Sequence, residues 1–133
     1  MKIPTKERAE KRALKAMSDY IRERDRWTCY TCGRKGDKHN MDAGHLFSRR
    51  FSAIKFDETN VHCQCVYCNK YLSGNVHEYI KRFLIEYGAE KYEHLDRIKN
   101  EYRKHTALEY IAIEQDFKAK LENIRRERTG GAA

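Results

Sequence analysis

Hydrophobic residues recur at helical spacing at both ends of the chain and lose that spacing in its middle. Near the N-terminus they fall every three or four positions, and Lys, Arg and Glu fill the places between them. This is typical of a surface helix with a narrow buried face. The pattern predicts a helix over residues 5–25, with an apolar stripe made of Ala9, Ala13, Leu14, Met17, Tyr20 and Ile21.

Helical spacing returns after residue 75 and predicts C-terminal helices over residues 76–128. Asn75 and Glu78 have the spacing of a capping box at the start of the first of these helices. Gly88 suits its C-terminal end. The apolar face of this helix would consist of Val76, Tyr79, Ile80, Phe83, Leu84 and Tyr87.

The helical period continues from about 89 to 104 and includes Tyr102. A second capping box, Thr106 with Glu109, predicts the start of a long final helix. The last residues, 129–133, are expected to be frayed. The apolar stripe of the final helix would pack into the core, or form a dimer seam, and consists of Tyr110, Ile113, Phe117, Leu121 and Ile124.

The centre of the chain, residues 26–75, shows no long period and contains several turn residues, as expected of a short hairpin and loops. Residues 1–133 are therefore expected to form a single domain of the α+β class, mostly helical. An N-terminal helix and C-terminal helices would flank an irregular centre.

Composition narrows the possible partners. The chain has 133 residues, a net charge of +8 and a pI near 9.3, which favours a polyanion such as nucleic acid. It has no apolar run near the roughly 20 residues that span a bilayer, and its charged first residues do not resemble a signal peptide. We therefore expect a cytoplasmic protein without membrane contact. Cysteine pairs in that reducing compartment are more often metal ligands than disulfides.

Four of the five cysteines form two CxxC pairs, Cys29 with Cys32 and Cys65 with Cys68. Each pair can place two thiolates on one tetrahedral ion, so the sequence predicts a structural zinc site with four cysteine ligands. Redox dithiols and free buried thiols are the alternatives. Cys63 would be a fifth thiolate for four places, and we expect it to be a small buried side chain beside the site.

Between and after the cysteine pairs, "DAGH", "ETNVH" and "VYCN" supply a histidine, an asparagine and a second asparagine, His45, Asn60 and Asn69. This order resembles the HNH nucleases, also called the ββα-metal or His-Me finger family, in an HNN variant. The resemblance implies a histidine on a hairpin strand, an asparagine in the next loop and a metal ligand at the start of a helix. Many family members frame this pattern with two zinc-binding CxxC pairs.

Longer stretches are similar to the phage NinG/Rap family of recombination proteins. They are "YIRERDRWTCYTCG", "DAGHLFSRR", "KFDETNVHCQCVYCNKYLSGN" and "FKAKLENIRRER", which together cover most of residues 18–128. The resemblance implies cleavage of branched recombination intermediates such as Holliday junctions, D-loops or flaps, in a phage-infected or prophage-carrying bacterium. It also implies contact with phage or host recombination proteins. A resolvase acts on two symmetry-related strands, so a homodimer is a further expectation.

The chemistry of phosphodiester hydrolysis gives the matched residues their expected roles. Water must lose a proton to attack phosphorus, and a neutral imidazole accepts that proton at physiological pH, so His45 is the expected general base. Asn60 would orient the loop after His45 through hydrogen bonds to the backbone. A catalytic Mg²⁺ or Mn²⁺ ion would stabilise charge on the leaving group.

The ligands of that catalytic ion are less directly indicated. Many HNH proteins have a metal-binding residue directly before the base, but this chain has Gly44 there. Asp42 falls on the same strand face as position 44, because side chains alternate with a period of two. Asp42 and Asn69 are therefore the expected ligands, with His62 as an alternative.

Five basic residues near the matched motifs are expected to contact DNA, and phosphate contacts would make binding salt-dependent. They are Arg49, Arg50, Lys55, Lys70 and Arg82. Two other functions remain open: an HNH enzyme that nicks or cuts duplex DNA without branch preference, and a non-catalytic zinc module that binds DNA as a recombination accessory.

Overall fold

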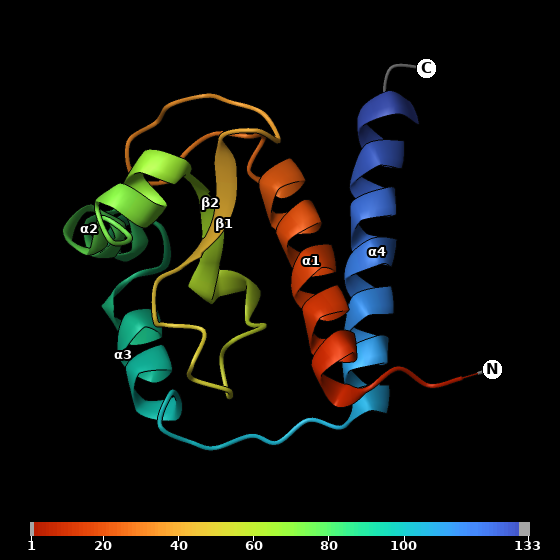
Figure 1. Ribbon diagram of the computed structural model, residues 1–133. Coiled ribbons are helices and arrows are strands. Elements are labelled where there is room, and N and C mark those ends of the chain that lie inside the picture. Colours follow the sequence, from red (N-terminus) through yellow and green to blue (C-terminus); the bar gives the residue numbers. More distant parts are fainter. Residues whose placement is uncertain (1, 131–133) are drawn as a thin grey trace.

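A two-stranded hairpin lies between two pairs of helices in the computed structural model, which describes residues 2–130 (Figure 1). Helices α1 (Lys6–Arg24) and α4 (Ala107–Gly130) lie side by side on one side of the hairpin. Helices α2 (Val76–Tyr87) and α3 (Ala89–Ile98) lie on the other side. The predicted mostly helical α+β class, with a small sheet in the centre, is confirmed.

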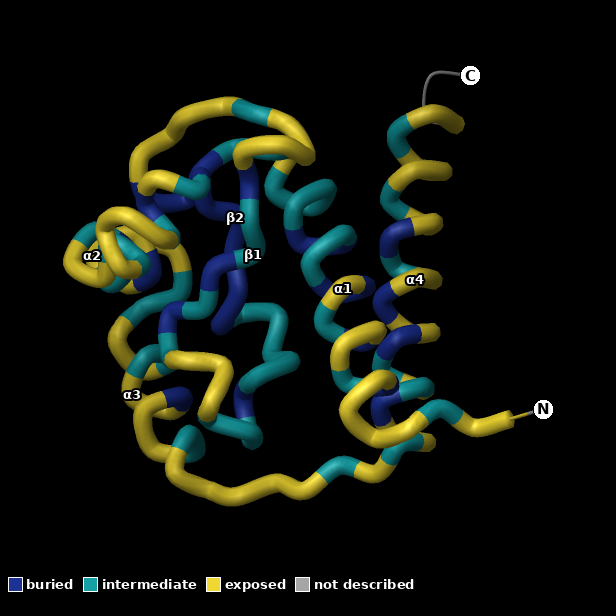
Figure 2. The backbone as a smooth tube through the Cα atoms, viewed as in Figure 1, coloured by how far each residue is buried: buried dark blue, intermediate teal, exposed yellow. Residues whose placement is uncertain are grey.

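The hairpin consists of β1 (Met41–His45) and β2 (Val61–Cys65), paired antiparallel with His45 opposite Val61 and Met41 opposite Cys65. Two short helical turns flank β2. A 3₁₀ turn, η1 (Glu58–Asn60), leads into the strand, and a π-helical turn, η2 (Tyr67–Tyr71), follows it. All five residues of β2 are buried, so this strand forms the centre of the molecule (Figure 2).

The N-terminal helix forms as predicted. Thr5 caps it, because the Thr5 hydroxyl accepts a hydrogen bond from the backbone N–H of Arg8 at 3.2 Å. At its C-terminal end, the Arg24 guanidinium donates to the backbone carbonyls of Glu58 (2.9 Å) and Val61 (2.8 Å). These bonds attach the end of α1 to the start of β2.

The capping box before the final helix is confirmed: Thr106 and Glu109 exchange backbone-to-side-chain hydrogen bonds, both of 3.1 Å. The predicted apolar stripe of α4 packs against α1, where Phe117 and Leu121 join Met17 and Ile21 in one buried cluster. The stripe is thus covered within the chain. Of the tail expected to be frayed, Thr129 and Gly130 belong to α4, and 131–133 lie outside the described residues.

Two predictions about the middle helices are wrong in detail. Asn75 does not cap α2, since it has a left-handed backbone (φ 46°) and its side chain makes no capping hydrogen bond. Helix α3 ends at Ile98 rather than near 104, and Tyr102 in the connection to α4 is 82% exposed. Gly88 does end α2, with a φ of 86° that an L side chain rarely adopts.

The core lies in clusters around the hairpin rather than in one large centre. One cluster joins α1, α4 and Val61, and another joins α2 and α3 to the loop after β1 through Leu46, Ile54 and Phe83. The outer faces of the helices are largely exposed (Figure 2). Among residues 2–130, no helix has the combination of length and apolarity that crossing a lipid bilayer would need.

Candidate functional site

The four cysteines of the two CxxC pairs come together at the open end of the hairpin. Their Sγ atoms all lie within 4.8 Å of one another, and those of Cys32 and Cys65 are 3.8 Å apart. Sulfurs that each bind one zinc ion tetrahedrally at about 2.3 Å would be separated by about 3.8 Å. The four cysteines therefore cluster in a way that could hold a metal such as zinc.

Hydrogen-bond donors surround this cluster. The backbone N–H of Cys68 points to the Cys65 sulfur at 3.4 Å, and the Asn75 amide to the Cys68 sulfur at 3.6 Å. Burial alone would raise the pKa of Cys29, but the Thr31 hydroxyl and nearby backbone N–H groups outweigh it and lower that pKa to about 6. Burial and hydrogen bonds with the other cysteines raise the pKa of Cys32 to about 12, although a backbone hydrogen bond at Arg34 opposes them.

The fifth cysteine stays outside the cluster, as predicted. Cys63 is fully buried on β2, and its sulfur does not belong to the group of four. Its backbone N–H donates to the carboxylate of Asp25 at 2.8 Å. Burial raises the pKa of the Cys63 thiol to about 12, so this side chain is a neutral part of the core.

His45 is the last residue of β1 and lines a cavity of about 570 Å³. Its Nε2 atom lies 2.9 Å from the backbone carbonyl oxygen of Lys55. A carbonyl only accepts, so Nε2 must carry the proton and Nδ1 has a free lone pair. Burial lowers the pKa of His45 below 6.5, aided by the charges of Arg49 and Lys55 and opposed by the Lys55 carbonyl.

Asn60 is completely buried and holds the loop that follows His45. Its Oδ1 accepts from the backbone N–H of Phe47 at 2.8 Å, and its Nδ2 donates to the carbonyls of Phe47 (3.0 Å) and Ile54 (3.2 Å). These contacts match the backbone-orienting geometry that the sequence predicted for this residue.

Asp42 and Asn69 line the same cavity as His45 and contact each other. The Asn69 amide donates from Nδ2 to the Asp42 carboxylate at 3.1 Å. The Asn69 carbonyl oxygen faces Gly44, since a Cβ built on that glycine would lie 3.1 Å from it. Asp42 and position 44 therefore face the same side of the strand, as the period of two predicted.

Gln64, on β2 opposite Asp42, was not predicted to take part. It is fully buried, and among residues 2–130 its Oε1 atom has no hydrogen-bond partner. A Cβ on Gly44 would overlap this oxygen. A carboxylate and two amide oxygens thus gather beside a glycine that leaves room for them, and such donors fit a hard divalent cation. No sequence motif marks Gln64 as part of a site, because it lies opposite Asp42 only through the pairing register of β1 and β2.

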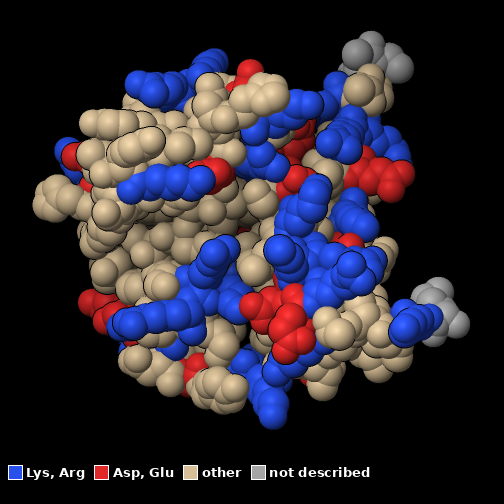
Figure 3. Space-filling model, in the orientation of Figure 1, with Lys and Arg blue, Asp and Glu red and all other residues tan. Residues whose placement is uncertain are grey.

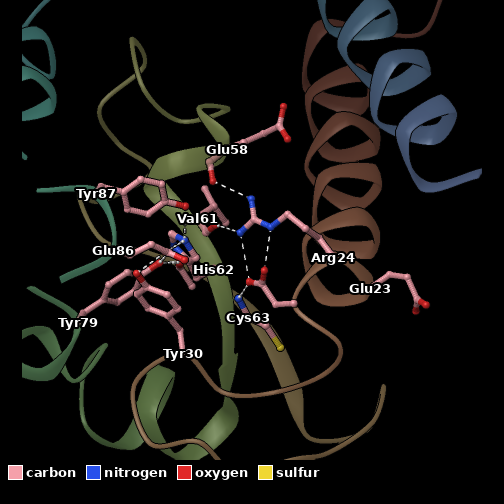
Figure 4. A network of polar contacts seen from close by, with 12 residues as sticks. Glu23, Arg24, Tyr30, Glu58, Val61, His62, Cys63, Tyr79, Glu86 and Tyr87 are labelled. Carbon is pink, nitrogen blue, oxygen red and sulfur yellow. Dashed lines mark hydrogen bonds and ion pairs between the residues drawn. The ribbon is translucent and has the colours of Figure 1, made fainter. Parts of the chain in front are cut away.

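The structure does not bring His62 into this cavity. His62 is buried between β2 and α2 and stacks on Tyr30 with ring centroids 3.9 Å apart (Figure 4). Its Nδ1 lies 3.2 Å from the Tyr79 hydroxyl and its Nε2 3.0 Å from the Tyr87 hydroxyl. Tyr79 donates to the carbonyl of Gly44 at 2.7 Å, so His62 supports the backbone before His45 and has no nitrogen free for a metal ion.

Three of the five basic residues expected to contact DNA, Arg49, Arg50 and Lys70, are exposed at the cavity or beside it. A second hollow adjoins the cavity that contains His45, and Arg49 lines both of them. Lys55 is paired with Glu10 at 3.0 Å, and Arg82 lies apart from the cavity, over the Tyr30 ring. Lys and Arg side chains gather over α1 and the adjoining loops around a small acidic group (Figure 3).

Comparison with known proteins identifies relatives of the chain. Residues 1–127 match the family described as Bacteriophage Lambda NinG protein. Over 126 residues, 92% of this chain, it is 35% identical to Protein ninG of Escherichia phage 933W and 34% identical to those of Salmonella phage P22 and Escherichia phage lambda. It spans about three fifths of the length of these relatives (60–61%). No solved structure matches it. The chain belongs to the NinG family of bacteriophage proteins.

Proposed function

We propose that the chain is a metal-dependent endonuclease of the HNH type, which hydrolyses phosphodiester bonds in branched DNA such as Holliday junctions. One observation carries the proposal. The Lys55 carbonyl binds Nε2 of His45 and leaves Nδ1 without a proton, and His45 lines the same cavity as Asp42 and Asn69, whose oxygen atoms can bind a cation.

His45 acts as the general base. The Lys55 carbonyl holds the proton on Nε2, which leaves the Nδ1 lone pair to accept a proton from the attacking water. The lowered pKa keeps the imidazole neutral at pH 7. Asn60 keeps this geometry by holding the loop between His45 and Lys55 through its hydrogen bonds to Phe47 and Ile54.

Asp42 and Asn69 would hold the Mg²⁺ or Mn²⁺ ion through oxygen atoms. When bound, such an ion stabilises negative charge on the phosphate and on the leaving 3′ oxygen. The Asp42 carboxylate would exchange its hydrogen bond with Asn69 for this contact.

The four cysteines, Cys29, Cys32, Cys65 and Cys68, hold a structural zinc ion in this proposal. One pair precedes β1 and the other begins at Cys65, the last residue of β2, so the ion would join the segments at the open end of the hairpin. Strand β1, which carries both Asp42 and His45, is thereby fixed relative to the turn η2, which carries Asn69.

DNA would follow the groove formed by the two adjoining hollows. Arg49 and Lys70 line the hollow that contains His45, and Arg50 extends the basic rim toward the N-terminal half of α1. The net charge of +8 favours the same partner. Lys55, through its pair with Glu10, ties this rim to α1 rather than offering a free charge.

Two exposed tyrosines support a preference for branched DNA. Tyr67 and Tyr71 flank Asn69 and Lys70 on η2, with exposed fractions of 52% and 77%, and their rings stack with centroids 6.1 Å apart. Exposed aromatic rings can stack on bases whose own stack is interrupted, as at a branch point, whereas the bases within regular duplex are covered by their neighbours.

Cleavage of a labelled four-way junction with Mg²⁺ or Mn²⁺ tests the proposal. The wild-type protein should cut the junction, and His45→Ala should bind it equally well but cut at least about 100-fold more slowly. His77→Ala, at an exposed position on α2, should behave as wild type.

The other outcomes identify the competing functions. Equal cutting of four-way, flap and linear duplex substrates would indicate a nuclease without branch preference. Binding without cutting by the wild type, under every cation tried, would indicate a zinc-containing accessory protein that binds DNA.

A further inference from the structure

The side-chain amide of Gln64 has a fixed orientation. Its Nε2 donates to the Thr31 hydroxyl at 3.1 Å and to the backbone carbonyl of Gly74 at 2.9 Å. Both amide hydrogens are therefore used, and a flipped amide would place an oxygen against the Gly74 carbonyl. Thr31 in turn contacts the Cys29 sulfur at 3.3 Å, so the cysteine cluster helps to hold Gln64 in place.

This orientation leaves the Gln64 oxygen buried without a donor. Among residues 2–130 nothing donates to Oε1, although the side chain is 0% exposed. A buried amide oxygen without a partner costs about 1–3 kcal/mol in folding free energy. A position with such a penalty calls for a ligand that the polypeptide itself does not provide.

A second amide oxygen borders the same space as this oxygen. The space over Gly44 is bounded by Gln64 Oε1 and Asn69 Oδ1, because a Cβ there would overlap the first and lie 3.1 Å from the second. Asn69 cannot turn its amino group toward Gln64 without turning its carbonyl oxygen toward the Asp42 carboxylate. Amide oxygens from β2 and η2 thus border one space, and the Asp42 carboxylate of β1 is hydrogen-bonded to the same Asn69 amide.

We propose that Gln64 Oε1 is a third protein ligand of the divalent cation that the proposed function assigns to Asp42 and Asn69. This inference rests on that proposed function. Hard cations prefer carboxylate and amide oxygens, and a third one satisfies the buried Gln64 carbonyl. Gly44 then has a positive role, since any side chain at this position would occupy the space of the Gln64 oxygen.

The inference can be tested without cleavage by measuring how tightly the zinc-loaded protein binds Mn²⁺. Binding is detected as loss of the electron paramagnetic resonance signal of the free ion. Gln64→Met keeps the length of the side chain but removes the oxygen, and should weaken Mn²⁺ binding about tenfold while zinc content stays unchanged. Gln64→Glu should bind Mn²⁺ more tightly than wild type. Gln115→Met, at an exposed position on α4, is the matched control and should bind as wild type.

The outcomes separate this inference from the proposal on which it rests. If Asp42→Asn weakens Mn²⁺ binding and both Gln64 variants bind as wild type, Gln64 is no ligand but the cation site stands. If the wild type binds no Mn²⁺, the cation site itself fails. If Gln64→Met does not retain zinc, Gln64→Glu decides the question, and an unchanged Mn²⁺ affinity in that variant overturns the inference.

Discussion

His45 Nε2 lies 2.9 Å from the backbone carbonyl oxygen of Lys55, ten residues further along the chain. This contact determines which imidazole nitrogen can accept a proton. It also connects the end of β1 to the loop that Asn60 holds, so the proposed base and its support are linked by hydrogen bonds.

The first prediction concerns the pH dependence of cleavage. The base must be neutral, and burial lowers the pKa of His45 below 6.5. The pH profile of kcat/KM reports the free protein, so kcat/KM should rise with pH, reach half its maximum below pH 6.5 and stay level at pH 7–8. Arg49→Gln removes a charge that lowers this pKa, so its midpoint should move upward. A midpoint above 6.5 in the wild type would contradict the assignment of His45.

The second prediction concerns stability in acid. Burial, aided by the charge of Arg24, lowers the pKa of His62 to about 4, whereas the unfolded side chain has the ordinary value of 6.5. The folded state thus binds this proton less readily than the unfolded state. The stability from a neutral His62 is complete above pH 6.5 and is lost as the pH falls toward 4, at about 1.4 kcal/mol per pH unit.

Urea unfolding measures this loss. Between pH 7.5 and pH 5 His62 alone should lower the free energy of unfolding by about 2 kcal/mol, in addition to the smaller contribution of His45. His62→Gln cannot titrate, so its curve should be flatter over the same range even though the variant is less stable at pH 7.5. Zinc content measured at each pH separates this effect from protonation of the cysteines. Parallel curves for the two proteins would rule out His62 as the cause.

A third prediction compares two cysteines. Cys68→Ser removes one of the four clustered sulfurs and should abolish zinc binding and unfold the hairpin. Cys63→Ser leaves the cluster intact, so the variant should retain about one zinc per chain. Its melting temperature should fall only modestly, since a hydroxyl replaces a buried thiol. Metal analysis after dialysis gives the first readout, and loss of zinc from Cys63→Ser would show that the cluster is wrongly assigned.

The fourth prediction concerns Asn60. Asn60→Ala removes three hydrogen bonds from a fully buried position and should lower the free energy of unfolding by about 2–4 kcal/mol. In this variant the backbone amides of the loop from Phe47 to Ile54 should exchange hydrogen faster than in the wild type, whereas exchange in α4 should stay the same. Asn123→Ala, exposed on α4, serves as the control. Unchanged exchange in the loop would mean that Asn60 does not hold it.

The fifth prediction concerns Tyr71, the more exposed of the stacked pair. Tyr71→Ala should weaken binding to a four-way junction about tenfold, in line with roughly 1–3 kcal/mol for one base stacked on an aromatic ring. Binding to linear duplex should change much less. Tyr102→Ala removes another exposed tyrosine, which lines neither hollow, and should have no effect. Equal losses on junction and duplex would show that Tyr71 does not distinguish them.

The long helices were predictable because their signals are local. The stripe from Ala9 to Ile21 and the capping box of Thr106 and Glu109 depend only on residues within one or two helical turns. The end of α3 was not predictable, because Tyr102 continues the apolar period and yet lies in the connection to α4. Asn75 has a capping sequence, but its amide points to the Cys68 sulfur instead.

In the candidate site, too, the features with a local sequence signal were predictable and the others were not. The spacing of the cysteine pairs predicted their meeting, and strand alternation placed Asp42 on the side of Gly44. His62 was considered as a metal ligand from its closeness in sequence, but the hairpin turns it toward α2. Gln64 lies opposite Asp42 only through the register of β1 and β2, and a single sequence does not determine that register.

The packing of α1 against α4 has a consequence for how the protein is made. Leu14, Met17 and Ser18 of α1 form one wall of the cavity, while the buried face of the same helix rests on residues of α4 more than ninety positions later. During synthesis α1 leaves the ribosome before the hairpin and its cysteines, but it lacks its support until residues 107–130 have also emerged. A nascent chain can therefore bind its metal well before that wall is in place.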